Sequence, residues 1–285
     1  MQFVAGQSMR ELVLLMKPRI TLLSVATAAT GLWLAPGSPS ASLVMLTLVG
    51  TLLLVGAAST LNMYFERDVD GLMARTRNRP LPAGRLQPRV AFWFGIGQAL
   101  VAIPMLALGT NPLTGVLGAF SLLTYVWIYT PLKRKTVLSL PIGAIPGAMP
   151  PLLGWTAATA QIELPALLLF AVVFFWQLPH FLAIALFRKG EYVAAGLKIM
   201  PAVNGEQATK HAIFVILVLQ VLVTLLLVPA GIGGHGYLIG ASLLGAIMLS
   251  FGYSGLHRPA VDAWARKLFI LSVIYLPVLF ALLFL

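Results

Sequence analysis

Three side chains that carry oxygen recur at every fourth position of one segment. Asn62, Glu66 and Asp70 are spaced i, i+4 and i+8. On an α-helix each would lie about 40° around and about 6 Å along from the one before. Mg²⁺ prefers hard oxygen ligands and is usually held by one or two carboxylates together with substrate phosphates. The stripe therefore predicts a site for magnesium and a phosphorylated ligand. Asp68 points away from the stripe, and we expect it to join only if the helix unwinds there.

Basic residues follow this stripe and recur in later loops. Arg75, Arg77 and Arg79 lie on one short segment, and guanidinium forks match phosphate oxygens. The candidates for gripping a diphosphate are Arg75, Arg79, Lys133, Arg134, Arg188 and Lys198. For each of them, the alternative is an ordinary interfacial charge that faces anionic lipid.

The composition shows that membrane helices must position these residues. Of 285 residues, 59% are hydrophobic and only 9% are charged, whereas a soluble domain carries about 25% charged residues. The absence of cysteine excludes disulfides, Cys-ligated metals and a thiol nucleophile. The net charge of +11 does not indicate nucleic acid, because the basic residues lie beside apolar runs. Anionic lipid or a phosphorylated ligand is the better partner class.

Nine apolar runs are long enough for transmembrane helices. They span approximately residues 20–35, 43–66, 90–109, 113–130, 138–156, 164–186, 212–230, 237–254 and 265–285. This pattern predicts an all-α polytopic membrane protein, formed by residues 1–285 as a single transmembrane domain. We expect nine helices around a central cavity that opens to the cytoplasmic side.

The charged residues test this count of helices. All 19 Lys and Arg residues fall on alternate loops, and Glu163 is the only charged residue on the opposite loops. This positive-inside bias predicts a multi-pass protein, in a bacterial cytoplasmic membrane, with the N-terminus in the cytoplasm and the C-terminus outside. The pattern leaves no carboxylate at mid-membrane, where proton-coupled transporters usually keep one. A lipid or isoprenoid transporter therefore remains only as an alternative.

The fifth run and the aromatic residues each allow two interpretations. The run 138–156 contains four prolines and three glycines, so a lipid-facing helix there would expose unsatisfied carbonyls. We expect it to line a groove, and the alternative is close helix packing at small residues. Aromatic residues near the ends of the fourth and sixth runs either form an interfacial belt or stabilise a cation with their rings. They are Tyr125, Trp127, Tyr129, Phe174, Phe175, Trp176 and Tyr192.

Several motifs in order resemble a known family. N-x-x-x-E-R-D-x-D at 62–70, followed by RTRNRPLPAG at 75–84, is similar to the first Asp-rich motif of the UbiA superfamily of intramembrane prenyltransferases. Four more segments resemble one branch of this superfamily, the branch that farnesylates haem. These are KPRI (17–20), YTPLKRKT (129–136), IGAIPGAMPPLLGW (142–155) and FWQLPHF (175–181).

The resemblance implies the nine-helix fold, Mg²⁺ as cofactor, and farnesyl diphosphate and haem B as substrates. The farnesyl group would be transferred to a vinyl carbon of haem B, with water added and diphosphate released. The alternative acceptors are a quinone-precursor aromatic or a chlorin. An association with haem A synthase or with terminal-oxidase assembly is also raised by the resemblance, and no motif speaks for or against it.

The resemblance also implies residue roles. Asn62, Glu66, Asp68 and Asp70 would form the first catalytic motif, with Asn62, Glu66 and Asp70 as metal ligands. The family has a second acidic motif in the loop after the sixth helix, and the sequence departs from it there. Glu191 stands where Asp is usual, and the position four residues later is Ala195. Glu191 is either a further metal ligand or an ordinary solvated charge. His180, with Trp176 one helical turn before it, would contact haem, and the alternative for His180 is a hydrogen-bonded core histidine.

Overall fold

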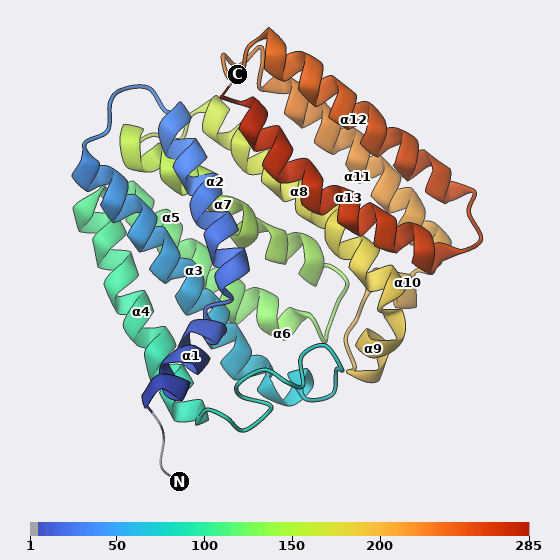
Figure 1. Cartoon of the computed structure of the whole chain (residues 1–285), viewed down its shortest axis with the longest axis horizontal. Helices are drawn as coiled ribbons and strands as arrows, with labels where there is room; N and C mark the ends of the chain where they lie inside the picture. Colours follow the sequence, from blue (N-terminus) through green and yellow to red (C-terminus); the bar gives the residue numbers. More distant parts are fainter. Residues whose placement is uncertain (1–4, 285) are drawn as a thin grey trace. The chain divides into compact units, whose positions relative to one another are not determined.

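The structure is a computed structural model that describes residues 5–284, and every regular element in that range is a helix (Figure 1). The elements are α1 (Ala5–Leu15), α2 (Pro18–Leu34), α3 (Ala41–Asp70), α4 (Pro88–Gly109), α5 (Pro112–Leu123), the π-helix η1 (Thr124–Tyr129), α6 (Thr130–Leu132), α7 (Ser139–Thr159), α8 (Leu164–Phe187), α9 (Lys189–Ala194), α10 (Met200–Val203), α11 (Glu206–Leu226), α12 (His235–Leu256) and α13 (Val261–Leu282). The all-α prediction is confirmed.

A multi-pass membrane protein is also confirmed, but nine spans are not. Seven helical segments in the described range are long and apolar enough to cross a membrane. The pair Met9–Leu15 and Pro18–Leu34, bent by 55°, would make eight. Helix α7 occupies the place of the fifth expected span and is not one of these eight. Its four prolines and three glycines make it less apolar than the others.

The chain divides into two compact units. Unit 1 comprises Met1–Leu132 and Met149–Gln161, and unit 2 comprises Lys133–Ala148 and Ile162–Leu285. The first half of α7 thus belongs to unit 2 and the second half to unit 1.

In unit 1, α3 packs against α2 and α4, and α4 packs against α5. Local caps fix where two of these helices begin. Ser40 accepts a hydrogen bond from the Leu43 amide at the start of α3, and Asn111 accepts one from the Thr114 amide at the start of α5.

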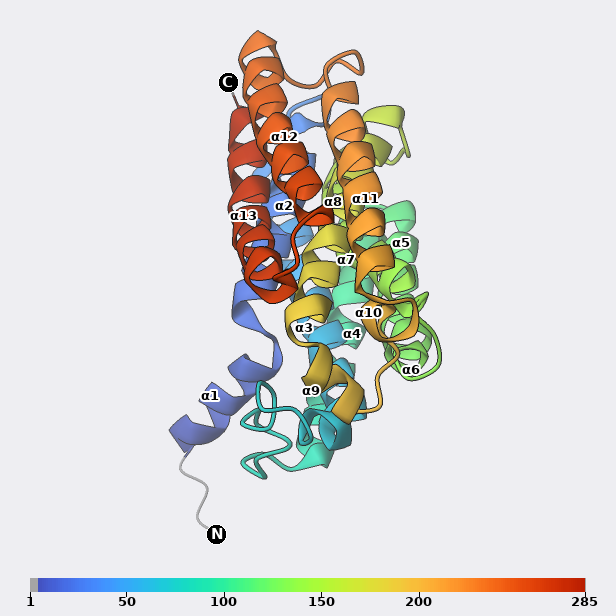
Figure 2. The ribbon, with the colours of Figure 1, turned by 90° about the vertical axis from the view of Figure 1, so that its right-hand side faces the viewer.

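The break between α1 and α2 falls at Lys17, which has a left-handed φ of 51° and precedes Pro18. Figure 2 shows α1 turning away from the axis of α2 at this break.

The loop between α3 and α4 is anchored by a small apolar cluster. Leu81 and Leu86 of this loop are buried with Leu15 of α1, Met63 of α3 and Ala91 of α4. Burial of a leucine side chain contributes about 1.5–3 kcal/mol, so the two leucines favour contact of the loop with the helices. The segment that carries the arginine-rich motif is therefore fixed on unit 1.

The second half of α7 packs closely on α2. A Cβ on Gly154 would collide with the backbone of Ala28, and a Cβ on Gly31 would collide with the backbone of Pro151. Backbones approach this closely only where side chains are absent. For this half of α7 the structure supports the close-packing alternative over the expected groove.

In unit 2, α8 packs against α11 and α13, and α12 packs against both α11 and α13. Figure 2 shows α11, α12 and α13 side by side. The short helices α9 and α10 lie between α8 and α11 along the chain, where the sequence predicts only a loop.

Candidate functional site

Helix α3 positions the oxygen stripe in unit 1. The helix continues unbroken to Asp70, four residues beyond the end of the apolar run. Asn62, Glu66 and Asp70 therefore share one helix face, as their spacing predicts. Asn62 and Asp70 are each only 1% exposed, and Glu66 is half-buried. Burying such polar groups is costly unless they have partners, so the partners of this stripe identify its chemistry.

Asp70 is paired with an arginine from the following loop. Arg79 Nη1 donates to Asp70 Oδ2 at 2.7 Å. Thr76 Oγ1 donates to the Asp70 carbonyl at 2.8 Å and draws the same loop back onto the helix end. Two residues expected to hold metal and diphosphate separately are therefore in direct contact. A charge-assisted bond of this length orients the guanidinium on the carboxylate.

Asn62 is held between two other elements of unit 1. Lys17 Nζ donates to Asn62 Oδ1 at 3.1 Å, and Asn62 Nδ2 donates to Thr130 Oγ1 at 3.1 Å. Thr130 Oγ1 in turn donates to the carbonyl of Tyr125 at 2.9 Å, across the π-helical turn of η1. Such π-turns are often found at functional sites. The Lys17 ammonium thus adds a cation beside the stripe.

The other predicted residues of this motif are more exposed. Because α3 stays regular, Asp68 does not join the stripe; its side chain is 80% exposed and lies 3.8 Å from Arg67 Nε. We expected Asp68 to join the stripe only if the helix unwound there, and α3 does not unwind. Arg75 is exposed on the loop. Arg85 forms an ion pair of 3.1 Å with Glu11 of α1 and helps to fix the loop.

The donors of unit 1 fit a magnesium ion that arrives with a diphosphate. Glu66 and Asp70 provide two hard carboxylates on one face, and Asn62 provides an amide oxygen that Lys17 already occupies. Among the described residues no group of three or more His, Asp or Glu side chains could hold a metal by itself. Mg²⁺ usually completes its shell with substrate phosphates and water. The residues present match this mode of binding.

Unit 2 brings two of the predicted basic loops together. The Lys198 amide donates to the Lys133 carbonyl at 2.9 Å, so the loop before α7 lies against the segment after α9. Arg134 and Lys198 are exposed there. Arg188 forms a short ion pair with Glu191. The residue expected to bind a second metal therefore neutralises one of the expected diphosphate ligands.

His180 lies in an aromatic and hydroxyl environment within unit 2. Its ring stacks on Trp176 with a centroid distance of 5.1 Å and lies 4.8 Å from the Phe269 ring. His180 Nδ1 is 2.8 Å from Ser272 Oγ, and Ser272 Oγ donates to the Phe269 carbonyl at 2.7 Å. A hydroxyl has one hydrogen, so Nδ1 must donate to Ser272. This leaves the lone pair of Nε2 for a further partner.

Three contributors have no role in the sequence prediction. Lys17 lies in the KPRI segment and Thr130 in YTPLKRKT, so the motifs identify the segments but not the contacts with Asn62. Ser272 lies 92 positions from His180 in an unremarkable apolar run. It also accepts, through its carbonyl, a 2.7 Å hydrogen bond from Trp176 Nε1.

Comparison with known proteins identifies the family. The model of the UbiA prenyltransferase family matches residues 24–274, and the chain belongs to this family. A protoheme IX farnesyltransferase of Sorangium cellulosum (strain So ce56) is 51% identical over 90% of this chain and 97% of its own length. A protoheme IX farnesyltransferase of Myxococcus xanthus (strain DK1622) is 50% identical over 95% of this chain and 92% of its own length.

Solved structures share the fold at low sequence identity. A digeranylgeranylglyceryl phosphate synthase superposes with a TM-score of 0.82 at 14% identity, over 96% of each chain. A UbiA homologue from Archaeoglobus fulgidus bound to GPP and Mg²⁺ superposes with a TM-score of 0.65 at 14% identity, over 96% of this chain and 100% of that one. At these identities the likeness concerns the fold.

Proposed function

We propose that the chain transfers the farnesyl group of farnesyl diphosphate to a vinyl carbon of haem B, adding water and releasing diphosphate, to form haem O. The observation that carries this proposal is the α3 stripe with its two cationic partners, Arg79 on Asp70 and Lys17 on Asn62. A prenyl diphosphate needs such a mixed acidic and basic site, and a lipid transporter does not. The acceptor is proposed from the relatives that are named protoheme IX farnesyltransferase.

The diphosphate and its metal are assigned to the end of α3. Glu66 and Asp70 would hold Mg²⁺, which supplies positive charge to the leaving diphosphate. The mode of binding is supported by the Archaeoglobus homologue that is bound to GPP and Mg²⁺. Of the expected diphosphate ligands, Arg75 and Arg79 of unit 1 are proposed to bind its oxygens there, and Lys133, Arg134, Arg188 and Lys198 of unit 2 stay predictions. To Arg75 and Arg79 we add Lys17, whose ammonium lies 3.1 Å from Asn62 Oδ1.

The chain's own residues would then carry out three tasks. Fixed cations near the diphosphate stabilise the charge that develops as the allylic C–O bond breaks. Aromatic rings such as the Tyr125 and Tyr129 pair, 5.2 Å apart, can stabilise the allylic cation. Apolar surroundings exclude water until the haem vinyl carbon attacks.

Haem contact is proposed for His180 and Trp176. Ser272 holds the His180 ring so that Nε2 keeps its lone pair, and neutral imidazole is a common ligand of haem iron.

Glu191 as a second metal ligand stays a prediction, because its carboxylate is paired with Arg188. The single domain of residues 1–285, the nine spans, the cytoplasmic N-terminus and the outer C-terminus belong to the same proposal. The central cavity stays a prediction.

Incubation of the purified protein with haem B, farnesyl diphosphate and Mg²⁺, followed by mass analysis of the pigment, tests the function. We expect a product that carries one farnesyl group and one hydroxyl group more than haem B, and no product when Mg²⁺ is chelated. Parallel incubations with a quinone-precursor aromatic or a chlorin test the alternative acceptors. Efficient prenylation of one of these, with haem B unchanged, would overturn the choice of acceptor and keep the prenyltransferase class.

A further inference from the structure

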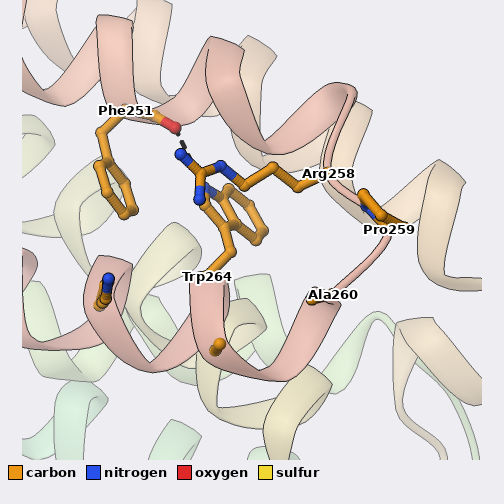
Figure 3. A pocket seen from close by; sticks show the side chains of 7 residues that line it. Phe251, Arg258, Pro259, Ala260 and Trp264 are labelled. Atoms are coloured by element: carbon orange, nitrogen blue, oxygen red, sulfur yellow. Dashed lines mark hydrogen bonds between the residues drawn. The ribbon is translucent and has the colours of Figure 1, made fainter.

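A pocket in unit 2 lies where α12 ends and α13 begins (Figure 3). It has a volume of about 220 Å³, and its lining includes Phe251, Arg258, Pro259, Ala263, Trp264 and Lys267. Trp264 is only 2% exposed, and its indole N–H donates to the Phe251 carbonyl at 3.0 Å. The Phe251 and Trp264 rings are stacked, with centroids 6.4 Å apart. The floor of the pocket is therefore built by fixed aromatic groups.

Two cations border this floor. The Arg258 and Lys267 side chains are exposed, and neither has an acidic partner among the ion pairs of the described residues. Figure 3 shows the Arg258 side chain extending from the loop toward Trp264. Asp262 is the acidic residue closest in sequence, and it does not line the pocket. The pocket therefore combines an apolar floor with an unneutralised positive rim.

A third cation contacts the loop that carries Arg258. Lys210 of α11 is only 4% exposed, and its ammonium donates to the Arg258 carbonyl at 2.7 Å. The bond fixes the loop that carries Arg258. A buried cation that donates to a neutral carbonyl also adds positive potential, since a low dielectric screens its charge poorly. Nothing in the proposed prenyl transfer uses this lysine.

A second hollow lies beside the pocket, along α12. It has a volume of about 510 Å³ and is lined by Leu243, Ala246, Ile247, Ser250, Phe251 and Ser254. Phe251 lines both hollows, so they adjoin at this residue. One end is cationic, and the other runs along a helix long and apolar enough to span a membrane.

We propose that these two hollows bind one anionic phospholipid, with its phosphodiester between Arg258 and Lys267 and an acyl chain along α12. A lipid is the occupant that has one anionic end and a long apolar tail lying parallel to a membrane helix. The basic loop lies at the cytoplasmic face in the proposed orientation, where anionic lipids attract basic residues. The pocket offers no carboxylate, so it lacks the means to hold a diphosphate through Mg²⁺ as α3 does.

Native mass spectrometry of the delipidated full-length protein tests this site. The probes are a phosphatidylglycerol and a phosphatidylcholine with identical acyl chains. The variant Arg258→Gln/Lys267→Gln removes the cationic rim. The matched control Arg89→Gln/Lys135→Gln removes two exposed cations from other basic loops. Ala263→Phe fills the pocket without changing its charge. Circular dichroism of each variant confirms its helical fold.

We expect one phosphatidylglycerol to bind preferentially and the rim variant to lower its affinity by about thirtyfold, since each basic group near anionic lipid contributes about 1 kcal/mol. Ala263→Phe should also lose the lipid, whereas the control should retain it. Equal losses in the rim variant and the control would overturn the proposal in favour of a diffuse surface charge. Equal binding of the two lipids, or displacement by farnesyl diphosphate without Mg²⁺, would overturn it as well.

Discussion

The two most buried members of the α3 stripe are each held by a cation from another segment. Lys17 lies 45 positions from Asn62 and Arg79 lies nine positions from Asp70. These contacts compensate the burial of polar groups and leave positive charge where a diphosphate would need it. The same side chains can therefore stabilise the free protein and bind the leaving group.

The first prediction concerns Asp70. Asp70→Asn should lower kcat for farnesyl transfer by at least about a hundredfold, because stabilisation of the leaving group by a metal is worth several kcal/mol. The double variant Asp70→Asn/Arg79→Gln separates catalysis from pairing, since it also removes the unpaired guanidinium. Turnover at saturating Mg²⁺ and thermal unfolding are measured together. Recovery of turnover in the double variant would reduce Asp70 to a partner of Arg79.

A second prediction concerns the hydroxyl that orients His180. His180→Ala should weaken haem binding far more than binding of farnesyl diphosphate, because the diphosphate site is assigned to other segments. Ser272→Ala should lower haem affinity about fivefold, the value of one hydrogen bond. Ser254→Ala is the matched control, since Ser254 Oγ donates to the Phe251 carbonyl as Ser272 Oγ donates to the Phe269 carbonyl, and it should leave haem affinity unchanged.

The haem absorption spectrum distinguishes the roles of His180. An axial ligand requires the Soret band to shift in His180→Ala, whereas an edge contact predicts lower occupancy with an unchanged spectrum. If haem affinity, spectrum and turnover were all unaltered, His180 would be a core histidine packed between Trp176 and Phe269.

At the scale of elements, close contact of α2 with α7 leads to a third prediction. Gly154→Ala should lower the thermal unfolding midpoint, because its Cβ would meet the Ala28 carbonyl and overpacking costs about 1–3 kcal/mol. Gly97→Ala is the matched control, since Gly97 is also helical and has open space around its Cβ position. Its midpoint should stay unchanged or rise, as alanine favours helix. A lower midpoint in Gly97→Ala and not in Gly154→Ala would contradict this packing.

The spacing of apolar and polar residues along the chain predicts most of the helices, but it does not predict the contacts between them. The spacing of Asn62, Glu66 and Asp70 identified their shared face, because a helix repeats every 3.6 residues whatever surrounds it. The π-helix η1 was missed, since hydropathy does not distinguish i+5 from i+4 hydrogen bonds. The pairs Asp70–Arg79 and Arg188–Glu191 were also missed. Each of these residues was assigned to a metal or a diphosphate because the sequence gives its charge but does not give the side chain that lies next to it in the fold.

At the scale of the whole molecule, the apolar composition predicts that the chain lies in a membrane, and the distribution of basic residues predicts its orientation there. Helices α3, α4 and α8 are apolar enough to span a membrane, and with nine spans the basic residues would all fall on alternate connections. Moving a cationic loop across the membrane is unfavourable, so such a distribution has one preferred orientation. Helix α7 is the element on which the number of crossings depends, because its prolines and glycines lower its apolarity.

The last prediction therefore tests orientation and the crossing by α7 together. A reporter fused after Leu285 should be active outside the cytoplasm, and one inserted in the 77–85 loop should be active inside. Reporters inserted after Lys135 and after Gln161, on the two sides of α7, should give opposite results if α7 crosses. If α7 only re-entered the membrane, these two reporters would agree and every later loop would change sides. The basic loop of Arg258 and Lys267 would then face outward, against the positive-inside rule, and a cytoplasmic reporter at Leu285 in an intact chain would establish that the nine-span count is wrong.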